Sequence, residues 1–167
     1  MSVNFWDSNC QTYSSKRLFG LCDPLAPAAV PAYIDEVDGA KWIGVVVNDP
    51  LHDVTFTAID HCIDIRTNDN AQTKRCDGVL TYDSTVIFVE LKDRSAIGNN
   101  WVKDAEKQLR STIDYFERTE MAVNYSEKKA YIANSGHPKF KSSQALRMEK
   151  FLLDTGYVLR IENRIVL

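Results

Sequence analysis

The fold of this chain is decided by residues 76–92, CDGVLTYDSTVIFVELK. Two runs rich in β-branched and aromatic residues, 76–82 and 85–92, flank the dipeptide Asp83-Ser84, which predicts a β-hairpin with a two-residue loop. The second run is almost continuously apolar, as is typical of a central strand covered on both faces. This stretch therefore predicts the middle of a β-sheet.

The hairpin fixes which side chains face one another. With a two-residue loop the numbers of facing residues have a constant sum, so Tyr82 faces Thr85 (82 + 85 = 167) and Asp77 faces Glu90 (77 + 90 = 167). Facing residues on antiparallel strands point to the same side, with Cβ atoms about 4.5–5.5 Å apart. Lys92 lies two residues beyond Glu90 and shares that side. The register thus predicts two carboxylates and one ammonium on one face of the hairpin.

Such a group of charges fits the chemistry of a metal-dependent hydrolase. Facing carboxylates repel one another unless a cation lies between them, and two carboxylates plus waters form the usual kind of Mg²⁺ site. A bound ion polarises a phosphoryl oxygen and activates water, and an adjacent lysine can orient or deprotonate that water. The alternative is a simple ion pair of Glu90 with Lys92 and a turn at Asp77-Gly78. Against it, Glu90 interrupts a buried run, where an unpaired charge is costly.

The pattern Asp77…Glu90-Leu91-Lys92 resembles the D…(D/E)-x-K signature of the PD-(D/E)XK nuclease superfamily, which includes restriction endonucleases and Holliday-junction resolvases. The resemblance covers residues 54–135 and leaves residues 1–50 unassigned. It implies a restriction-endonuclease-like α/β fold, a mixed β-sheet flanked by helices. It also implies that Asp77 and Glu90 hold Mg²⁺ or Mn²⁺ while Lys92 assists the attacking water.

Further residues enter through the same resemblance. Gln108 resembles a glutamine that many members carry on the helix after the motif; it could equally hydrogen-bond a neighbour. The position four residues on, often Tyr in that motif, is Thr112 here. Many members also have an upstream acidic residue, for which Glu36 and Asp60 are the candidates; Asp60 is favoured as a metal ligand if its strand borders the hairpin.

Two basic residues precede the motif. Lys74 and Arg75 stand just before Asp77, and Arg75 would face Lys92 in the same register. The pair is a candidate contact for the phosphates of a nucleic acid, and the alternative is a solvated loop.

Alternating patterns on both sides of the hairpin predict the remaining architecture. Strands are expected at 41–48, 54–65, 128–134 and 157–161, a short helix at 33–38, and longer helices at 100–118 and 142–153, the last closed by Gly156. The helix at 100–118 has the clearest signal, because its apolar residues recur at three- and four-residue steps. A meander followed by alternating helices and strands predicts one α/β domain spanning residues 1–167.

Composition excludes several other classes of protein. The chain has 167 residues, 44% hydrophobic, and a net charge of −3, which is ordinary for a globular domain and lacks the basic surface of many nucleic-acid binders. No apolar run approaches the ~20 residues of a membrane span, and no signal peptide begins the chain. The four cysteines form no CxxC pair and are expected to be reduced and largely buried; a zinc site of His61, Cys62 and Cys76 matches no standard spacing. A cytoplasmic location follows.

The sequence therefore predicts a metal-dependent nuclease that hydrolyses phosphodiester bonds, with DNA favoured because the family prefers it. A homodimer would suit cleavage of two strands. The alternative hypothesis is a catalytically idle nuclease-like fold that serves as a protein- or nucleic-acid-binding module in a defence or immunity system. A third and weaker hypothesis is a structural subunit without a metal.

Overall fold

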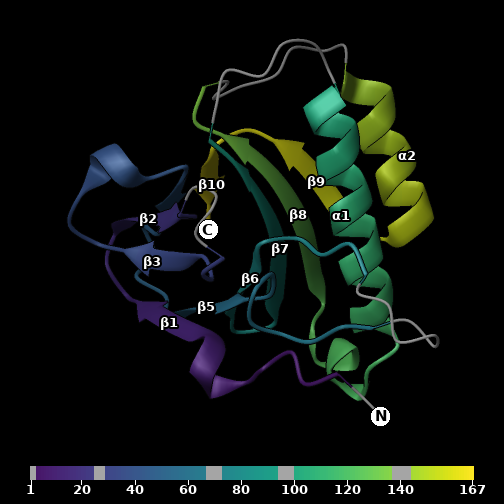
Figure 1. The fold of residues 1–167 in the computed structure, drawn as a ribbon, viewed down its shortest axis with the longest axis horizontal. Helices are drawn as coiled ribbons and strands as arrows, with labels where there is room; N and C mark the ends of the chain where they lie inside the picture. The colour runs from purple at the N-terminus through teal and green to yellow at the C-terminus, as the bar shows by residue number, and fades with distance from the viewer. Residues whose placement is uncertain (1–2, 25–28, 67–72, 94–99, 137–143) are drawn as a thin grey trace.

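The computed structural model describes residues 3–24, 29–66, 73–93, 100–136 and 144–167. These residues form two mixed β-sheets and two α-helices, so the chain has an α/β fold. Both helices lie on one side of the larger sheet and the smaller sheet lies on the other side (Figure 1).

The larger sheet contains the hairpin in its interior. Its described strands are, in spatial order, β1 (Gln11–Ser14), β5 (Val54–Ala58), β6 (Gly78–Tyr82), β7 (Thr85–Lys92), β8 (Glu127–Asn134) and β9 (Val158–Ile161). The first four strands pair antiparallel, whereas β8 and β9 continue parallel to β7. The change of direction follows from the connections, because a tight turn joins β6 to β7 while α1 lies between β7 and β8 in the chain.

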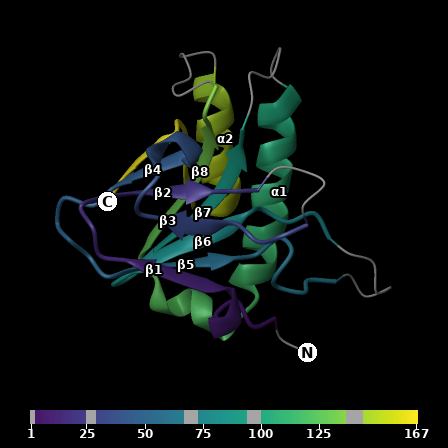
Figure 2. The same ribbon diagram turned by 60° about the vertical axis from the view of Figure 1, so that its left-hand side comes forward.

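The smaller sheet is built largely from the N-terminal part of the chain. Its described strands are β10 (Arg164–Val166), β4 (Gly44–Val47), β2 (Leu18–Cys22) and β3 (Tyr33–Asp35), in that order. The last strand of the chain pairs parallel with β4, so the C-terminus closes onto the N-terminal part. Figure 2 shows this sheet in front of the larger one.

Both α-helices contact the larger sheet. Helix α1 (Asn100–Glu117) buries an apolar stripe that includes Val102, Leu109 and Phe116, which matches its three- and four-residue periodicity. Helix α2 (Ala145–Thr155) ends at Gly156, whose φ of 81° is the left-handed C-cap conformation that glycine adopts without steric cost. None of the helices in the described residues has the length and apolar character needed to cross a membrane.

Alternation along β7 divides the core into two layers. Val86 and Phe88 pack toward the helices with Leu109 and Phe116, whereas Ile87, Val89 and Leu91 pack toward the smaller sheet. Glu90 and Lys92 continue the helix-facing set, because side chains two residues apart share a face. The strand is therefore covered on both faces, as its continuous apolar run predicts.

The hairpin, the helix at 100–118, the strand at 128–134 and the Gly156 cap are confirmed, but other segments differ from prediction. Tyr33–Asp35 is a strand rather than a helix, because it pairs with β2. The strand predicted over 54–65 ends at Ala58, where the chain turns and the N–H groups of Cys62 and Ile63 donate to the Ile59 carbonyl. Strands β1, β2 and β10 were not predicted, since strands this short show too little periodicity to be recognised.

The expectation of four reduced cysteines is wrong for two of them. Cys10 and Cys62 form a disulfide that joins the short 3₁₀ turn Ser8–Cys10 to the loop after β5, while Cys22 and Cys76 are free and buried. Sequence spacing could not predict this pair, because 52 residues separate its members and folding alone brings them together. The prediction of a cytoplasmic location rested in part on reduced cysteines, and the Cys10–Cys62 disulfide removes that part of its support.

Candidate active site

Four of the predicted residues meet at one end of the β6–β7 hairpin, under α1. The register is the predicted one, with Tyr82 opposite Thr85 and Gly78 opposite Val89, so that Asp77 comes opposite Glu90. Gly78 is required beside Asp77, since a Cβ there would lie 2.2 Å from the Phe56 ring.

The two carboxyl groups are locked in place by backbone amides. Oδ2 of Asp77 accepts a hydrogen bond from the Leu91 N–H at 2.6 Å, and Oε1 of Glu90 accepts one from the Asp77 N–H at 3.1 Å. These reciprocal bonds tie the two strands together beyond the last regular pair of the ladder. Asp77 is 7% exposed and Glu90 is 1% exposed, so both acids are removed from bulk water.

Lys92 supplies the positive charge of this cluster. Its Nζ lies 2.9 Å from Oε2 of Glu90 and donates to Oε1 of Gln108 at 3.3 Å. The Lys92 side chain is 27% exposed, so the ammonium lies between the buried acids and solvent. Burial lowers the pKa of Lys92, but the charge and hydrogen bond of Glu90 outweigh it, and the pKa stands above its usual value.

One ammonium does not neutralise two buried carboxylates. Burial, the charge of Glu90 and a hydrogen bond with its carboxyl group hold the pKa of Asp77 well above the usual range. Burial also raises the pKa of Glu90, against the opposing effect of Lys92. Two buried acids beside one ammonium therefore leave an excess of negative charge, which favours a further cation at this place.

Helix α1 completes the cluster through Gln108. Its Oε1 accepts from Lys92, and its Nε2 donates to the carbonyl of Arg75 at 3.1 Å. Thr112, one turn further on, donates to the Gln108 carbonyl and accepts from the Cys76 N–H at 2.9 Å. Thr112 therefore attaches the helix to the strand entry next to Asp77, and Gln108 fixes the ammonium of Lys92.

The other predicted residues lie beside the cluster. Asp60 is 3.3 Å from Arg75 and 3.3 Å from His61, and the Arg75 guanidinium also donates to the carbonyl of Ile63. The regular β6–β7 pairs end at Gly78 and do not reach Arg75, whose side chain turns toward Asp60 and is 10% exposed. Lys74 is exposed.

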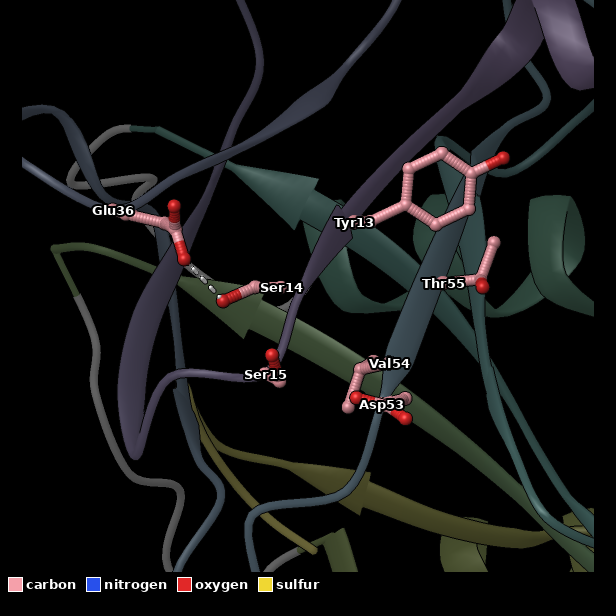
Figure 3. Close-up of a pocket in the computed structure, with 7 residues that line it drawn as sticks. All are labelled: Tyr13, Ser14, Ser15, Glu36, Asp53, Val54 and Thr55. Carbon is pink, nitrogen blue, oxygen red and sulfur yellow. Dashed lines mark hydrogen bonds between the residues drawn. The ribbon is translucent and has the colours of Figure 1, made fainter.

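Glu36 lies elsewhere in the molecule. It accepts a hydrogen bond from the Ser14 hydroxyl at 2.7 Å and lines a surface pocket with Tyr13, Asp53 and Thr55, residues of or beside β1 and β5 (Figure 3). The pocket contains none of the residues of the hairpin cluster. Of the two upstream acids, Asp60 is therefore the one linked to the cluster, through Arg75 and Gln108.

A further acid near the cluster escaped prediction. Asp23 directly follows β2, and burial together with the charges of Asp77 and Asp60 raises its pKa to about 7, against the opposing effect of His61 and Lys92. The available signal was a carboxylate at the end of an apolar run, Leu18–Cys22, followed by Pro24. The pairing of the smaller sheet, which the sequence did not reveal, brings this residue toward Asp77.

Asn134 also escaped prediction. It ends β8, pairs with Lys92 at the end of β7, and is completely buried. Its Oδ1 accepts the Gly136 N–H at 2.8 Å, but no acceptor for its Nδ2 exists in the structure as described. Leaving such a donor unsatisfied costs about 1–3 kcal/mol.

The fit of a metal ion can be judged from this donor set. The described residues include no group of three or more His, Cys, Asp or Glu side chains arranged to hold a metal. The adjacent carboxyl groups of Asp77 and Glu90 are nevertheless of the type that Mg²⁺ uses, since Mg²⁺ is commonly held by one or two carboxylates with waters and substrate oxygens. The charge of two buried acids beside one ammonium favours a further cation, so these two residues fit the ion.

Comparisons of the chain with protein-family models, with curated proteins and with solved structures give no significant match. The likeness to a nuclease family therefore depends on the hairpin residues and their contacts alone.

Proposed function

We propose that this protein is a metal-dependent nuclease with a restriction-endonuclease-like fold, hydrolysing phosphodiester bonds of nucleic acid, with DNA as the favoured substrate. The observation that supports it best is the buried pair of carboxyl groups, Asp77 and Glu90, with Lys92 between Glu90 and Gln108. A structural ion pair needs one acid and one base. This cluster has an extra buried acid that only a further cation can compensate.

Each residue has a role in this proposal. Asp77 and Glu90 would hold Mg²⁺ or Mn²⁺, which supplies Lewis acidity at the phosphoryl group when bound. Lys92, whose pKa is raised and which is therefore an ammonium, orients the attacking water and offsets charge on the phosphate. Gln108 keeps the ammonium of Lys92 at the edge of the site, and Asp60, Lys74 and Arg75 border it.

The test is cleavage of a circular plasmid with Mn²⁺ or with EDTA, comparing the wild type with Lys92→Ala. We expect nicking that needs Mn²⁺ and falls about 10²–10³-fold in the variant, the usual cost of removing one group that stabilises charge in the transition state. Lys150→Ala is the matched control, because this lysine lies on α2 in a different ion-pair cluster. Equal cleavage by wild type and Lys92→Ala would assign the activity to a contaminant and count against the proposal.

The second candidate function is a nucleic-acid- or protein-binding module without useful catalysis. The observation that favours it is the 2.9 Å contact of Lys92 with Glu90, which occupies an oxygen that a metal ion would use. Absence of cleavage on plasmid, single strands and branched DNA, with binding retained, would favour this candidate. The homodimer stays a prediction in either case.

A further inference from the structure

The ends of β7 and β8 carry a polar pair that the proposed nuclease roles do not use fully. Lys92 and Asn134 are partners in the parallel ladder, so their side chains leave the sheet on the same face. The core confirms that face, because Ala130 and Ile132 of β8 pack toward the helices while Tyr131 and Ala133 pack toward the smaller sheet. Asn134 thus lies beside Lys92 in the ladder, on the face of the sheet that also carries Glu90.

The orientation of the Asn134 amide is fixed by its own turn. Oδ1 is held by the Gly136 N–H, and the Ser135 N–H donates to the Lys92 carbonyl at 3.0 Å, so the turn is attached to β7. The donor end of the amide, Nδ2, therefore has no acceptor among the described residues. Asn48 shows the contrast, since its buried Nδ2 donates to the carbonyls of both Lys16 and His52.

The missing acceptor has a definite chemistry. An amide donor on the ladder neighbour of a lysine favours an oxygen that carries negative charge, since hydrogen bonds to ionised acceptors are the stronger ones. Glu90 and Asp77 already accept from Lys92 or from backbone amides. A phosphate oxygen brought by a ligand satisfies both the amide and the ammonium.

We infer that Asn134 is a substrate-binding residue whose Nδ2 donates to a non-bridging oxygen of the phosphate held beside Lys92. The inference rests on the proposed nuclease function and adds to it a neutral donor from the neighbouring strand. Nδ2 is shielded from solvent in the free protein, so the inference requires the groups that cover it to move when the phosphate binds.

The first measurement is binding of thymidine 3′,5′-bisphosphate with Mg²⁺, followed through the side-chain amide signals in ¹⁵N–¹H spectra. The Asn134 signal is assigned by its loss in Asn134→Asp, which keeps the shape and the Oδ1 acceptor. We expect this signal to shift on binding and the affinity of Asn134→Asp to fall about tenfold to hundredfold, as for loss of a hydrogen bond to a charged group. Asn48→Asp, whose amide is already satisfied, is the control and should keep the affinity.

Two outcomes would overturn the inference. One is binding that shifts the backbone amide signals of Glu90 and Lys92 but leaves the side-chain amide signal of Asn134 unchanged. The other is no binding at all. A plasmid-cleavage assay distinguishes failure of this inference from failure of the nuclease proposal. Metal-dependent nicking at equal rates in the wild type and Asn134→Asp would reject the phosphate contact and leave the nuclease proposal standing. If Asn134→Asp does not fold, the wild-type titration still decides, with the amide assigned by sequential methods.

Discussion

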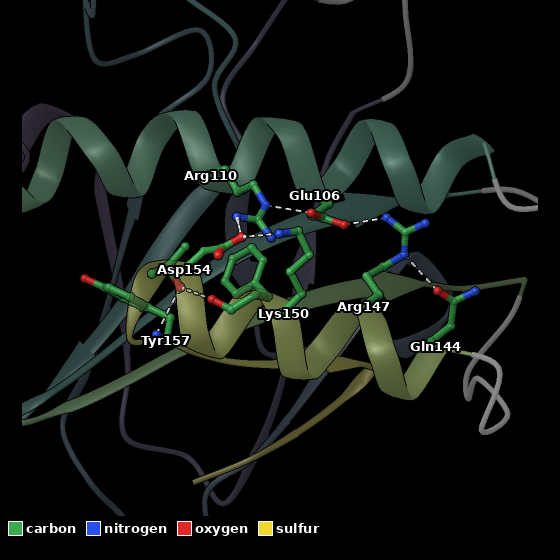
Figure 4. A network of polar contacts seen from close by, with 9 residues as sticks. Glu106, Arg110, Gln144, Arg147, Lys150, Asp154 and Tyr157 are labelled. Atoms are coloured by element: carbon green, nitrogen blue, oxygen red, sulfur yellow. Dashed lines mark hydrogen bonds and ion pairs between the residues drawn. The ribbon is translucent and has the colours of Figure 1, made fainter.

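The protein has two clusters of charged residues at α1 that differ in burial and in charge balance. The hairpin cluster has two almost fully buried acids, Asp77 and Glu90, and one ammonium. The other cluster joins α1 to α2 at the surface: Arg110 lies 2.6 Å from Glu106 and 3.0 Å from Asp154 (Figure 4). Its further members are Arg147, which contacts Glu106, and Lys150, 3.4 Å from Asp154.

The pKa shifts of the two clusters have opposite signs. In the α1–α2 cluster, hydrogen bonds and charges of Arg110 and Lys150 outweigh burial and lower the pKa of Asp154. In the hairpin cluster, burial raises the pKa of Asp77 and of Glu90, and the charge of Glu90 raises that of Asp77 further. Acids that outnumber bases in a buried place favour a further cation, whereas the α1–α2 cluster has three bases for two acids and needs none. This difference is the physical basis for placing the chemistry at the hairpin.

The largest effect is expected from a divalent ion. At a concentration of about 100 times its Kd, Mn²⁺ should stabilise the wild type by about 2.7 kcal/mol, because it binds the folded state only. For a chain of this size that raises Tm by about 5–10 °C. Glu90→Gln should lose the response and Glu106→Gln, in the α1–α2 cluster, should keep it, as measured by thermal denaturation. An equal response in both variants would remove the distinction between the clusters.

The pH dependence of stability gives the next contrast. Asp23 has a pKa of about 7 in the folded protein and 3.8 as its ordinary value. Between these values the unfolded chain has released the proton that the folded protein keeps, so the unfolding free energy falls as pH rises, by at most about 1.4 kcal/mol per pH unit for one such group. Denaturant titrations with EDTA from pH 4 to 8 should show a smaller fall for Asp23→Asn. An unchanged slope would show that Asp23 is not buried near Asp77.

The smallest effect should come from the surface. Lys150 is largely exposed, with its side chain at 74%, and its contact with Asp154 is one turn of α2. Exposed pairs of this kind contribute about 0.2–1 kcal/mol. Lys150→Ala should therefore change the unfolding free energy within that range and leave the Mn²⁺ response as in the wild type. A loss above about 2 kcal/mol would show that this cluster carries more of the fold than exposed pairs do.

The hairpin cluster was largely predictable, because its information is local. A two-residue turn fixes the register, and the register places Asp77 opposite Glu90 and Lys92 beside it. Helix periodicity then places Gln108 near the buried face of α1. These steps need only the spacing of residues along the chain.

Asp23, Asn134 and the Cys10–Cys62 bond were not predictable, because each depends on contacts between distant segments. Asp23 reaches the cluster through the smaller sheet, and Asn134 through the parallel pairing of β8 with β7. Such pairing is set by the burial of whole faces rather than by local pattern.

The sequence by itself determined the β6–β7 register, helix α1 and the facing acids, because backbone geometry converts spacing directly into direction. Only the tertiary structure decided how deeply those acids are buried, which basic side chain pairs with which acid, and which upstream acid lies near them. Burial and charge compensation are properties of packing between segments, and the raised pKa of Asp77, the turn of Arg75 toward Asp60 and the unsatisfied amide of Asn134 all arise there.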